Sequence, residues 1–283
     1  MRHNLLGCAA AGLLLTAFAG VAQAENRTTP RPPANPKPAT AKVPIAQTQG
    51  ANTASPSEAL RNAAAHGKYA FIFFYRSDDE RTQQMRKVFD AALGNLADRA
   101  EPVTVRVTDP AEKPIVNKFK VGDAPMPFVF SIAPNGAVVR SYRSVFTEQQ
   151  LADAFVSPGL EKTLKSLQDR KMTFLCVQNS STAHDAEAMK GVNEFKKDPK
   201  YAKTTEVVTI DPSDAAEAHF LRNLKVDPNM PEAVTILIAP PGKIVGTYRG
   251  ATEKTALVAA VKKASKGCGC KGGCKKPAKQ KGK

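Results

Sequence analysis

The stretch Ala133-Pro-Asn-Gly-Ala-Val-Val-Arg-Ser-Tyr-Arg143 occurs a second time as Ala239-Pro-Pro-Gly-Lys-Ile-Val-Gly-Thr-Tyr-Arg249, with six of eleven positions identical. In each copy, a turn that contains Pro and Gly separates two runs of β-forming residues, which predicts a β-hairpin. We expect the hairpin strands at 128–132 and 137–142, and again at 233–238 and 243–248. A hairpin repeated in this way indicates that the chain holds two copies of one domain.

Other landmarks recur in the same order around the two hairpins, at offsets of about 102–106 residues. They are Met85 and Met189, Asp109-Pro110 and Asp211-Pro212, Lys120-Val121 and Lys225-Val226, and Met126-Pro127 and Met230-Pro231. We therefore expect a first domain at residues 55–156 and a second at 157–264, each of a common domain size.

Within each copy, the hydrophobic pattern predicts helix, strand, helix, strand, helix, strand, strand, helix. The first helix is expected at 57–66 with Ser57 at its N-cap. Residues 70–75 form a continuous apolar and aromatic run, which indicates a strand buried on both faces. The helix expected at 78–96 repeats its apolar side chains at helical spacing. A crossover followed by a hairpin and a helix gives an α/β fold with a mixed central sheet and helices on both faces.

This order of elements resembles the thioredoxin-like superfamily over residues 55–264. Phe74-Tyr75 ends the first predicted strand, where thioredoxins carry an aromatic pair. Met126-Pro127 precedes the third strand, where thioredoxins place a cis-proline, and Met230-Pro231 is its repeat. The resemblance implies two tandem thioredoxin-like domains, with cis-prolines at Pro127 and Pro231.

Thioredoxin redox chemistry needs a Cys-x-x-Cys at the start of the helix after the first strand, because the helix N-terminus lowers the pKa of the attacking thiol. Counting back from Met85 puts Asp79 and Thr82 at those positions in the first copy. In the second copy they are Ala183 and Ala186. No cysteine occurs between positions 9 and 175. The sequence therefore argues against a dithiol enzyme and favours a binding or scaffold module.

Several residues near these positions have an ordinary structural interpretation. Asp78, Asp79 and Glu80 could form a cation site, but acids at a helix start are more often there to stabilise it. His184 beside Asp185 could form a catalytic pair, but we expect an exposed histidine. Cys176 lies within a predicted strand, as a small buried hydrophobe does. Met126 and Met230 are expected to fill apolar space, although thioether sulfur is also a soft metal ligand.

The two ends of the chain differ from the middle. Residues 1–24 read as a signal peptide with an apolar stretch and a small-x-small cleavage site, Ala22-Gln-Ala24. Residues 25–54 are rich in Pro and Ala, which predicts a disordered, extended linker. After residue 24, no apolar run is as long as the one in the signal peptide, so we expect no transmembrane segment after cleavage. These features predict an exported protein of the periplasm or cell envelope of a bacterium, or an extracellular one.

Residues 265–283 form a tail rich in Cys, Lys and Gly. Cys268, Cys270 and Cys274 fall within seven residues, and Lys side chains lower the pKa of such thiols. The spacing suits a soft ion, Cu(I) or Zn(II), with Cu(I) fitting three thiolates better than zinc, which prefers four ligands. A disulfide or an intermolecular crosslink, or a basic anchor for anionic surfaces, are the alternatives.

The formal net charge of +15 belongs mainly to that tail. Residues 262–283 carry +9, whereas residues 58–261 carry only +2. A nearly neutral folded part argues against a nucleic-acid-binding body. We expect protein partners or an anionic envelope surface instead. Three functions stay open: a binding or scaffold module, a redox or metal-handling protein that uses the tail cysteines, and a structural envelope protein attached through the tail.

Overall fold

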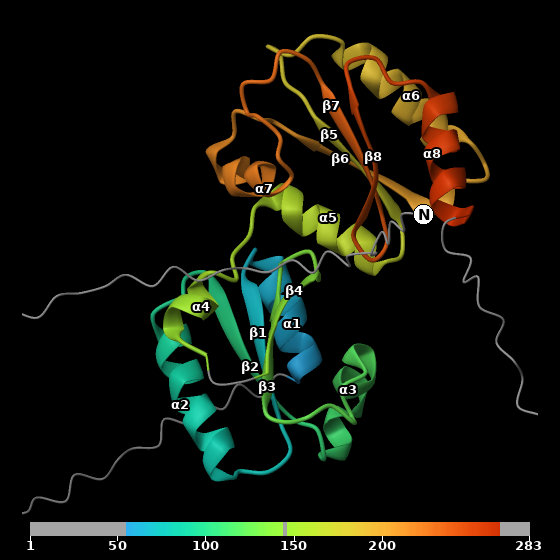
Figure 1. Ribbon diagram of the computed structural model, residues 1–283. Helices are drawn as coiled ribbons and strands as arrows, with labels where there is room; N and C mark the ends of the chain where they lie inside the picture. The colour runs from blue at the N-terminus through green and yellow to red at the C-terminus, as the bar shows by residue number, and fades with distance from the viewer. Residues whose placement is uncertain (1–54, 144–145, 267–283) are drawn as a thin grey trace, which may run out of the picture. The chain divides into compact units, whose positions relative to one another are not determined.

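A computed structural model describes residues 55–143 and 146–266 of the chain. These residues form two four-stranded sheets with flanking helices (Figure 1), which confirms the predicted α/β class with two mixed sheets in tandem. The predicted signal peptide, the linker and the cysteines of the tail lie outside the described residues. Within the described ranges, no helix has both the length and the apolar character that crossing a membrane requires.

The first domain has the strand order β2-β1-β3-β4, in which β1 and β2 are parallel and the remaining pairs are antiparallel. Its elements are α1 (Pro56–Ala65), β1 (Tyr69–Tyr75), α2 (Glu80–Gly94), β2 (Ala100–Arg106), the 3₁₀ turn η1 (Pro110–Glu112), α3 (Lys113–Phe119), β3 (Phe128–Ile132), β4 (Val138–Tyr142) and α4 (Glu148–Ala152). This order and these strand directions are those of the thioredoxin-like fold that the sequence predicted.

The second domain repeats the arrangement with the strand order β6-β5-β7-β8 and the same directions. Its elements are α5 (Pro158–Gln168), β5 (Met172–Val177), α6 (Asp185–Lys197), η2 (Ala202–Thr204), β6 (Thr205–Ile210), η3 (Ala215–Glu217), α7 (Ala218–Asn223), β7 (Val234–Ala239), β8 (Lys243–Arg249) and α8 (Lys254–Lys266). The internal repeat of the sequence is therefore a repeat of the fold.

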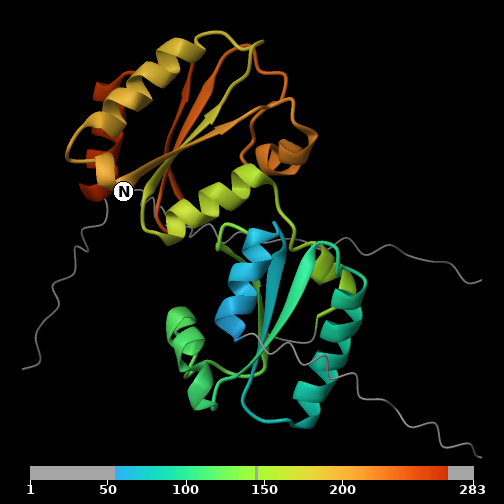
Figure 2. The ribbon, with the colours of Figure 1, turned by 180° about the vertical axis from the view of Figure 1, so that it is seen from behind.

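Strand β1 shows why each sheet needs helices on both faces. Tyr69, Phe71 and Phe73 belong to a core that contains residues of α2 and α4. The alternate residues Ala70, Ile72 and Phe74 belong to a second core with residues of α1 and α3. Successive side chains of a strand point to opposite faces, so an all-apolar strand requires a cover on each side. Figure 2 shows the helices on both faces of each sheet.

The N-cap of the first helix lies two residues earlier than expected. Ser55, rather than Ser57, is the N-cap of α1, and its hydroxyl accepts a hydrogen bond from the Glu58 N–H. The Glu58 carboxylate accepts in return from the Ser55 N–H at 2.8 Å, which completes a capping box. Pro56 fits the first helical position because its missing N–H would have no partner there. The capping box therefore sets the helix start.

Helix α6 touches the segment that leads into α8 at a glycine. A Cβ atom added to Gly191 of α6 would overlap the carbonyl oxygen of Thr252, just ahead of α8, and would lie 2.7 Å from its carbonyl carbon. Thr252 is itself buried, at 3% exposure. The lack of a side chain at position 191 thus lets α6 approach the backbone that leads into α8.

A buried carboxylate holds the start of α5. Glu217 is 4% exposed, and one of its oxygens accepts a hydrogen bond from the Gly159 N–H at 2.7 Å. Gly159 lies in the first turn of α5, where unpaired N–H groups and the helix dipole favour a negative charge. A Cβ atom at Gly159 would lie 2.8 Å from both carboxylate oxygens, so a larger residue there would push the Glu217 side chain out of this contact.

Candidate functional site

The resemblance to thioredoxins places the active site at the carboxyl ends of the two parallel strands, at the start of the helix that follows the first strand. In the first domain, that helix is α2. Asp79 is the N-cap of this helix and accepts hydrogen bonds from the Thr82 N–H and the Ser77 hydroxyl, both at 2.9 Å. These bonds, with the backbone bond first, hold the pKa of Asp79 below its ordinary value. The predicted capping function of this acid is confirmed.

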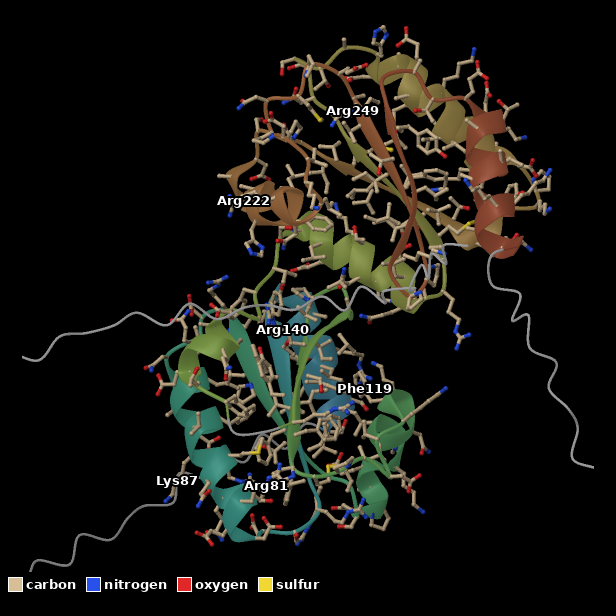
Figure 3. The ribbon with its side chains drawn as sticks, viewed as in Figure 1. Arg81, Lys87, Phe119, Arg140, Arg222 and Arg249 are labelled. Carbon is tan, nitrogen blue, oxygen red and sulfur yellow. The ribbon has the colours of Figure 1, made fainter. Side chains whose placement is uncertain are left out.

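Residues next to Asp79 are also buried or paired at the start of α2. Thr82 is buried, at 1% exposure. Asp78 faces the Arg86 guanidinium at 3.9 Å. Arg81, labelled in Figure 3, donates a hydrogen bond to the Arg143 carbonyl at 3.1 Å. The two positions where a Cys-x-x-Cys would lie thus hold a cap and a buried hydroxyl side chain, with no thiol.

The proline preceding β3 fulfils one expectation, whereas its repeat does not. The Met126–Pro127 peptide bond is cis, as the resemblance implied. Within the described ranges, the other cis bond is Pro240–Pro241, so the expectation of a cis-proline at Pro231 is wrong.

Strand register explains the difference. Ala70 pairs with Ile132 in the first sheet, and Thr173 pairs with Ile238 in the second. Ile132 and Ile238 are 106 positions apart, so Pro127 corresponds to Ala233. Met230-Pro231 follows Met126-Pro127 at an offset of 104, which is two residues out of register with the strands.

In the second domain, main-chain hydrogen bonds hold the residues just before α6 against the segment that leads into β7. The Ala183 N–H donates to the Pro231 carbonyl, and the Ala233 N–H donates to the Ala183 carbonyl, both at 2.9 Å. These bonds form a parallel bridge between Ala183 and Glu232. Ala186 follows in the first turn of α6 as an exposed methyl side chain. The two counted-back positions, Ala183 and Ala186, therefore present no group that could attack a disulfide.

His184 does not form a catalytic pair with its neighbour. It precedes α6 with a left-handed φ of 65°, is exposed, and makes no capping bond through its side chain. The Asp185 carboxylate instead accepts from the Thr182 hydroxyl at 2.7 Å. The expectation of an exposed histidine is confirmed.

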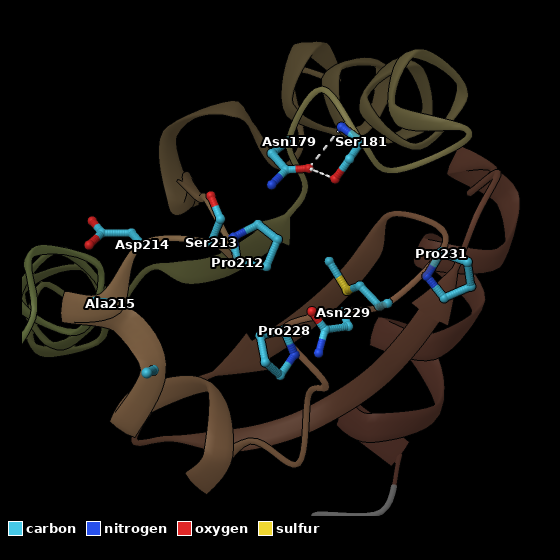
Figure 4. A pocket seen from close by; sticks show the side chains of 11 residues that line it. Asn179, Ser181, Pro212, Ser213, Asp214, Ala215, Pro228, Asn229 and Pro231 are labelled. Carbon is cyan, nitrogen blue, oxygen red and sulfur yellow. Dashed lines mark hydrogen bonds between the residues drawn. The ribbon is translucent and has the colours of Figure 1, made fainter.

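A polar cleft of about 610 Å³ opens beside this helix start (Figure 4). Three loops form its walls: those after β5, after β6 and before β7. The lining residues are mostly short and polar or are prolines, and they are Asn179, Ser181, Pro212, Ser213, Asp214, Ala215, Ala218, Pro228, Asn229, Met230 and Pro231. Met230 is 5% exposed and belongs to the hydrophobic core, which confirms that it fills apolar space.

Asp211 ties two of these loops together. One of its carboxylate oxygens accepts the Ser213 hydroxyl at 2.7 Å, the Ser213 N–H at 2.9 Å and the Asn179 amide at 2.9 Å. Because all three donors favour the ionised form, they lower the pKa of Asp211, the Ser213 hydroxyl most. Asn179 in turn accepts two bonds from Ser181, drawn in Figure 4. Hydrogen bonds to the ionised Asp211 carboxylate therefore hold two of the cleft's loops in place.

The sequence did not identify the cleft residues as a site. Asp211-Pro212 stands out in the sequence only as the repeat of Asp109-Pro110, and Ser213 and Asn229 carry no signal of a site. The repeated Asp-Pro after the second strand of each copy was the usable clue. Asp109 also caps a 3₁₀ turn, by accepting from the Ala111 N–H at 2.9 Å.

The thiols divide into one buried residue and a group outside the described part. Cys176 is 1% exposed, and burial raises the pKa of its thiol to about 12. A thiol that stays protonated at neutral pH is a poor nucleophile. Cys268, Cys270 and Cys274 lie outside the described residues. Within residues 55–143 and 146–266, no group of three or more His, Cys, Asp or Glu side chains could hold a metal ion.

Comparison with known proteins gave structural likeness alone. No protein-family model and no curated protein sequence matches the chain. The first two thioredoxin domains of Saccharomyces cerevisiae Eps1p are 10% identical to it with a TM-score of 0.28, over 74% of this chain and 96% of that one. Human ERp44 is 12% identical with a TM-score of 0.33, over 74% and 56%. The thioredoxin-2 of a malaria parasite is 12% identical with a TM-score of 0.27, over 30% and 79%. The thioredoxin-like fold is assigned from the strand order and register of each domain.

Proposed function

We propose that the chain is an exported binding module built from two thioredoxin-like domains that carry no catalytic dithiol. One observation carries the proposal: at both helix starts, the place of the reactive thiol is taken by groups already hydrogen-bonded within the chain. Asp79 and Thr82 take it in the first domain, and the Ala183 bridge takes it in the second. Such a site can still contact a binding partner, but it has no thiolate to attack a disulfide.

The polar cleft of the second domain is the ligand site, and an extended segment of a protein partner is the ligand. Its volume lies within the range of about 300–1,000 Å³ usual for binding pockets. Apart from Met230, its lining has no large apolar side chain, and it has no aromatic one, although such side chains usually hold drug-like molecules. Exposed groups such as Ser213, Asp214 and Asn229 offer instead the donors and acceptors that a peptide backbone and polar side chains need.

Filling the cleft will weaken binding of an unfolded chain. The probe is reduced, carboxamidomethylated α-lactalbumin, which is unfolded and has no free thiol. In Ala215→Trp the indole occupies the cleft, and we expect affinity to fall by about tenfold or more, as fluorescence anisotropy measures it. Ala202→Trp is the matched control, since Ala202 is exposed in η2 and does not line the cleft. Equal affinity of both variants, or no binding of the probe by the unaltered chain, would contradict the proposal.

The tail is proposed to hold a soft metal ion through Cys268, Cys270 and Cys274, with Cu(I) or Zn(II) as the metal. Protein recovered from the exported fraction should begin at Glu25 and contain metal in a fixed ratio by elemental analysis. We expect the Cys268→Ser/Cys270→Ser/Cys274→Ser variant to lose that metal, because these three thiolates are the soft ligands of residues 265–283. Cys176→Ser is the control and should keep it.

The same variant separates the other functions. Insulin-disulfide reduction that disappears in the triple variant would support a redox protein acting through the tail. If metal and reduction are both absent, but membrane attachment is present and lost on deletion of residues 265–283, the chain is instead a structural envelope protein anchored by its basic tail.

A further inference from the structure

Strand β8 lies at one edge of the second sheet and has no neighbouring strand on its outer side within the described residues. An edge strand presents a row of N–H and C=O groups to which another extended chain can pair. Ile244 of β8 is 48% exposed, the one large hydrophobic side chain of the described residues that is open to this degree. Its counterpart in the first domain, Val138, is only partly exposed. A single exposed apolar side chain is ordinary on a protein surface, but Ile244 lies on an unpaired strand edge, where an added strand would cover it.

A groove of about 390 Å³ runs between the start of β8 and the second half of α8. Its lining residues are Lys243, Ile244, Val245, Ala260, Lys263 and Ala264. Ile244 thus has an apolar recess beside it, with a lysine on each of the two elements. An extended chain pairing with β8 would pass this recess and could place one apolar side chain there.

The charge around the groove has one sign. Neither β8 nor α8 contains an acidic residue. Lys254, at the start of α8, is paired with Asp198 at 2.8 Å, whereas Lys243, Lys262 and Lys263 make no ion pair within the described ranges. Arg249, labelled in Figure 3 at the far end of β8, adds a further unpaired cation by the same criterion. A partner segment that carries acids therefore complements this edge.

We propose that the β8 edge binds an extended acidic segment of another protein, which adds to the second sheet as a fifth strand. An apolar residue of the segment lies beside Ile244, and its carboxylates face Lys243 and Lys263. Main-chain pairing supplies part of the affinity, and the side-chain contacts supply the selectivity. This surface is independent of the polar cleft.

Charge argues against two other occupants of this edge, a second copy of β8 and the terminal segments of the chain itself. Antiparallel pairing of two β8 strands about Gly246 would set Lys243 of one copy opposite Arg249 of the other, and like charges directly opposite destabilise a sheet. Residues 25–54 and 265–283 of the chain itself are both net positive. An acidic partner is the occupant that the groove favours.

Three peptides test the proposal on the full chain: Ac-Glu-Ile-Glu-Thr-Glu-Ile-Glu-NH₂ and its analogues with Gln or Lys at every Glu. We expect the acidic peptide to bind and to shift the amide NMR signals of β8, and the Lys analogue not to bind. Lys243→Glu/Lys263→Glu should weaken the acidic peptide by about tenfold or more. Lys190→Glu/Lys203→Glu, which reverses two exposed lysines away from the groove, should change its affinity by less than about twofold.

The proposal is overturned if the acidic peptide does not bind, if the three peptides bind alike, or if both double variants respond equally. It is also overturned if analytical ultracentrifugation shows a dimer that Ile244→Glu converts to monomer, since the edge would then pair with its own copy. Circular dichroism of each variant confirms that these exposed changes leave the fold intact. Ala215→Trp, which alters the cleft, should bind the acidic peptide as the unaltered chain does, because Ala215 does not line the groove, so failure here and failure of the cleft are distinguishable.

Discussion

Gly191→Ala is expected to lower the free energy of unfolding of the second domain by about 3 kcal/mol or more. The added methyl would overlap the Thr252 carbonyl, which is backbone and cannot swing aside as a side chain can. Helix α6 must therefore move away from the segment leading into α8, which would loosen the core containing Val192, Phe195 and Leu257. Urea unfolding followed by circular dichroism measures the loss.

The same substitution at Gly94 should have the opposite sign. Gly94 ends α2, and a Cβ atom there would meet nothing within 4 Å. Alanine reduces the entropy of the unfolded chain and favours helix, so we expect a gain of about 0.5–1 kcal/mol. If Gly191→Ala proved as harmless as Gly94→Ala, the close approach of α6 to Thr252 would be wrong.

Phe74→Ala should cost the first domain about 3–5 kcal/mol. Phe74 is 0% exposed in the middle of the sheet, and its ring stacks on Phe128 with centroids 5.0 Å apart. The Phe130 ring meets it edge-on at 5.7 Å, so truncation leaves a cavity among large rings that cannot collapse without moving strands. Denaturant unfolding followed by near-UV circular dichroism tests the effect.

Phe119→Ala is the matched comparison for Phe74→Ala. Phe119 belongs to the same aromatic group but is only partly buried, on helix α3. Its removal should cost clearly less, because part of the ring already contacts water and the space left is open to solvent. Equal losses for the two variants would show that burial at Phe74 does not decide the stability of this core.

The sequence was sufficient for the architecture because the architecture depends on local patterns. The all-apolar run of β1, the helical spacing of Met85 and Phe89 and the turn at Asn135-Gly136 each belong to one element, and the repeat supplied a second example of each. The N-cap of α1 was mispredicted, because Ser55 and Ser57 are both good N-cap residues; the reciprocal bond with Glu58 and the place of Pro56 select Ser55.

The sites were less predictable because they depend on register and on contacts across long stretches of chain. The Met-Pro dipeptide looked like a repeat, but the backbone pairing of Thr173 with Ile238 places Ala233 where the first domain has Pro127. The contact of Gly191 with Thr252 joins residues on different elements, and a glycine in a helix gives no sign of what lies beside it. The bond from Asn179 to Asp211 likewise joins two loops that no local pattern connects.

The bridge at Ala183 has a consequence for how this protein can change by mutation. Its two bonds use the N–H and C=O of Ala183, and the methyl group points to an exposed position. Any residue except proline can supply those two groups, so drift at this codon leaves the loop intact. The first domain has no such freedom, because Asp79 closes its helix through a side chain that few other amino acids can replace. The two domains thus differ in how freely the residue at the helix start can be replaced without changing the shape of the loop.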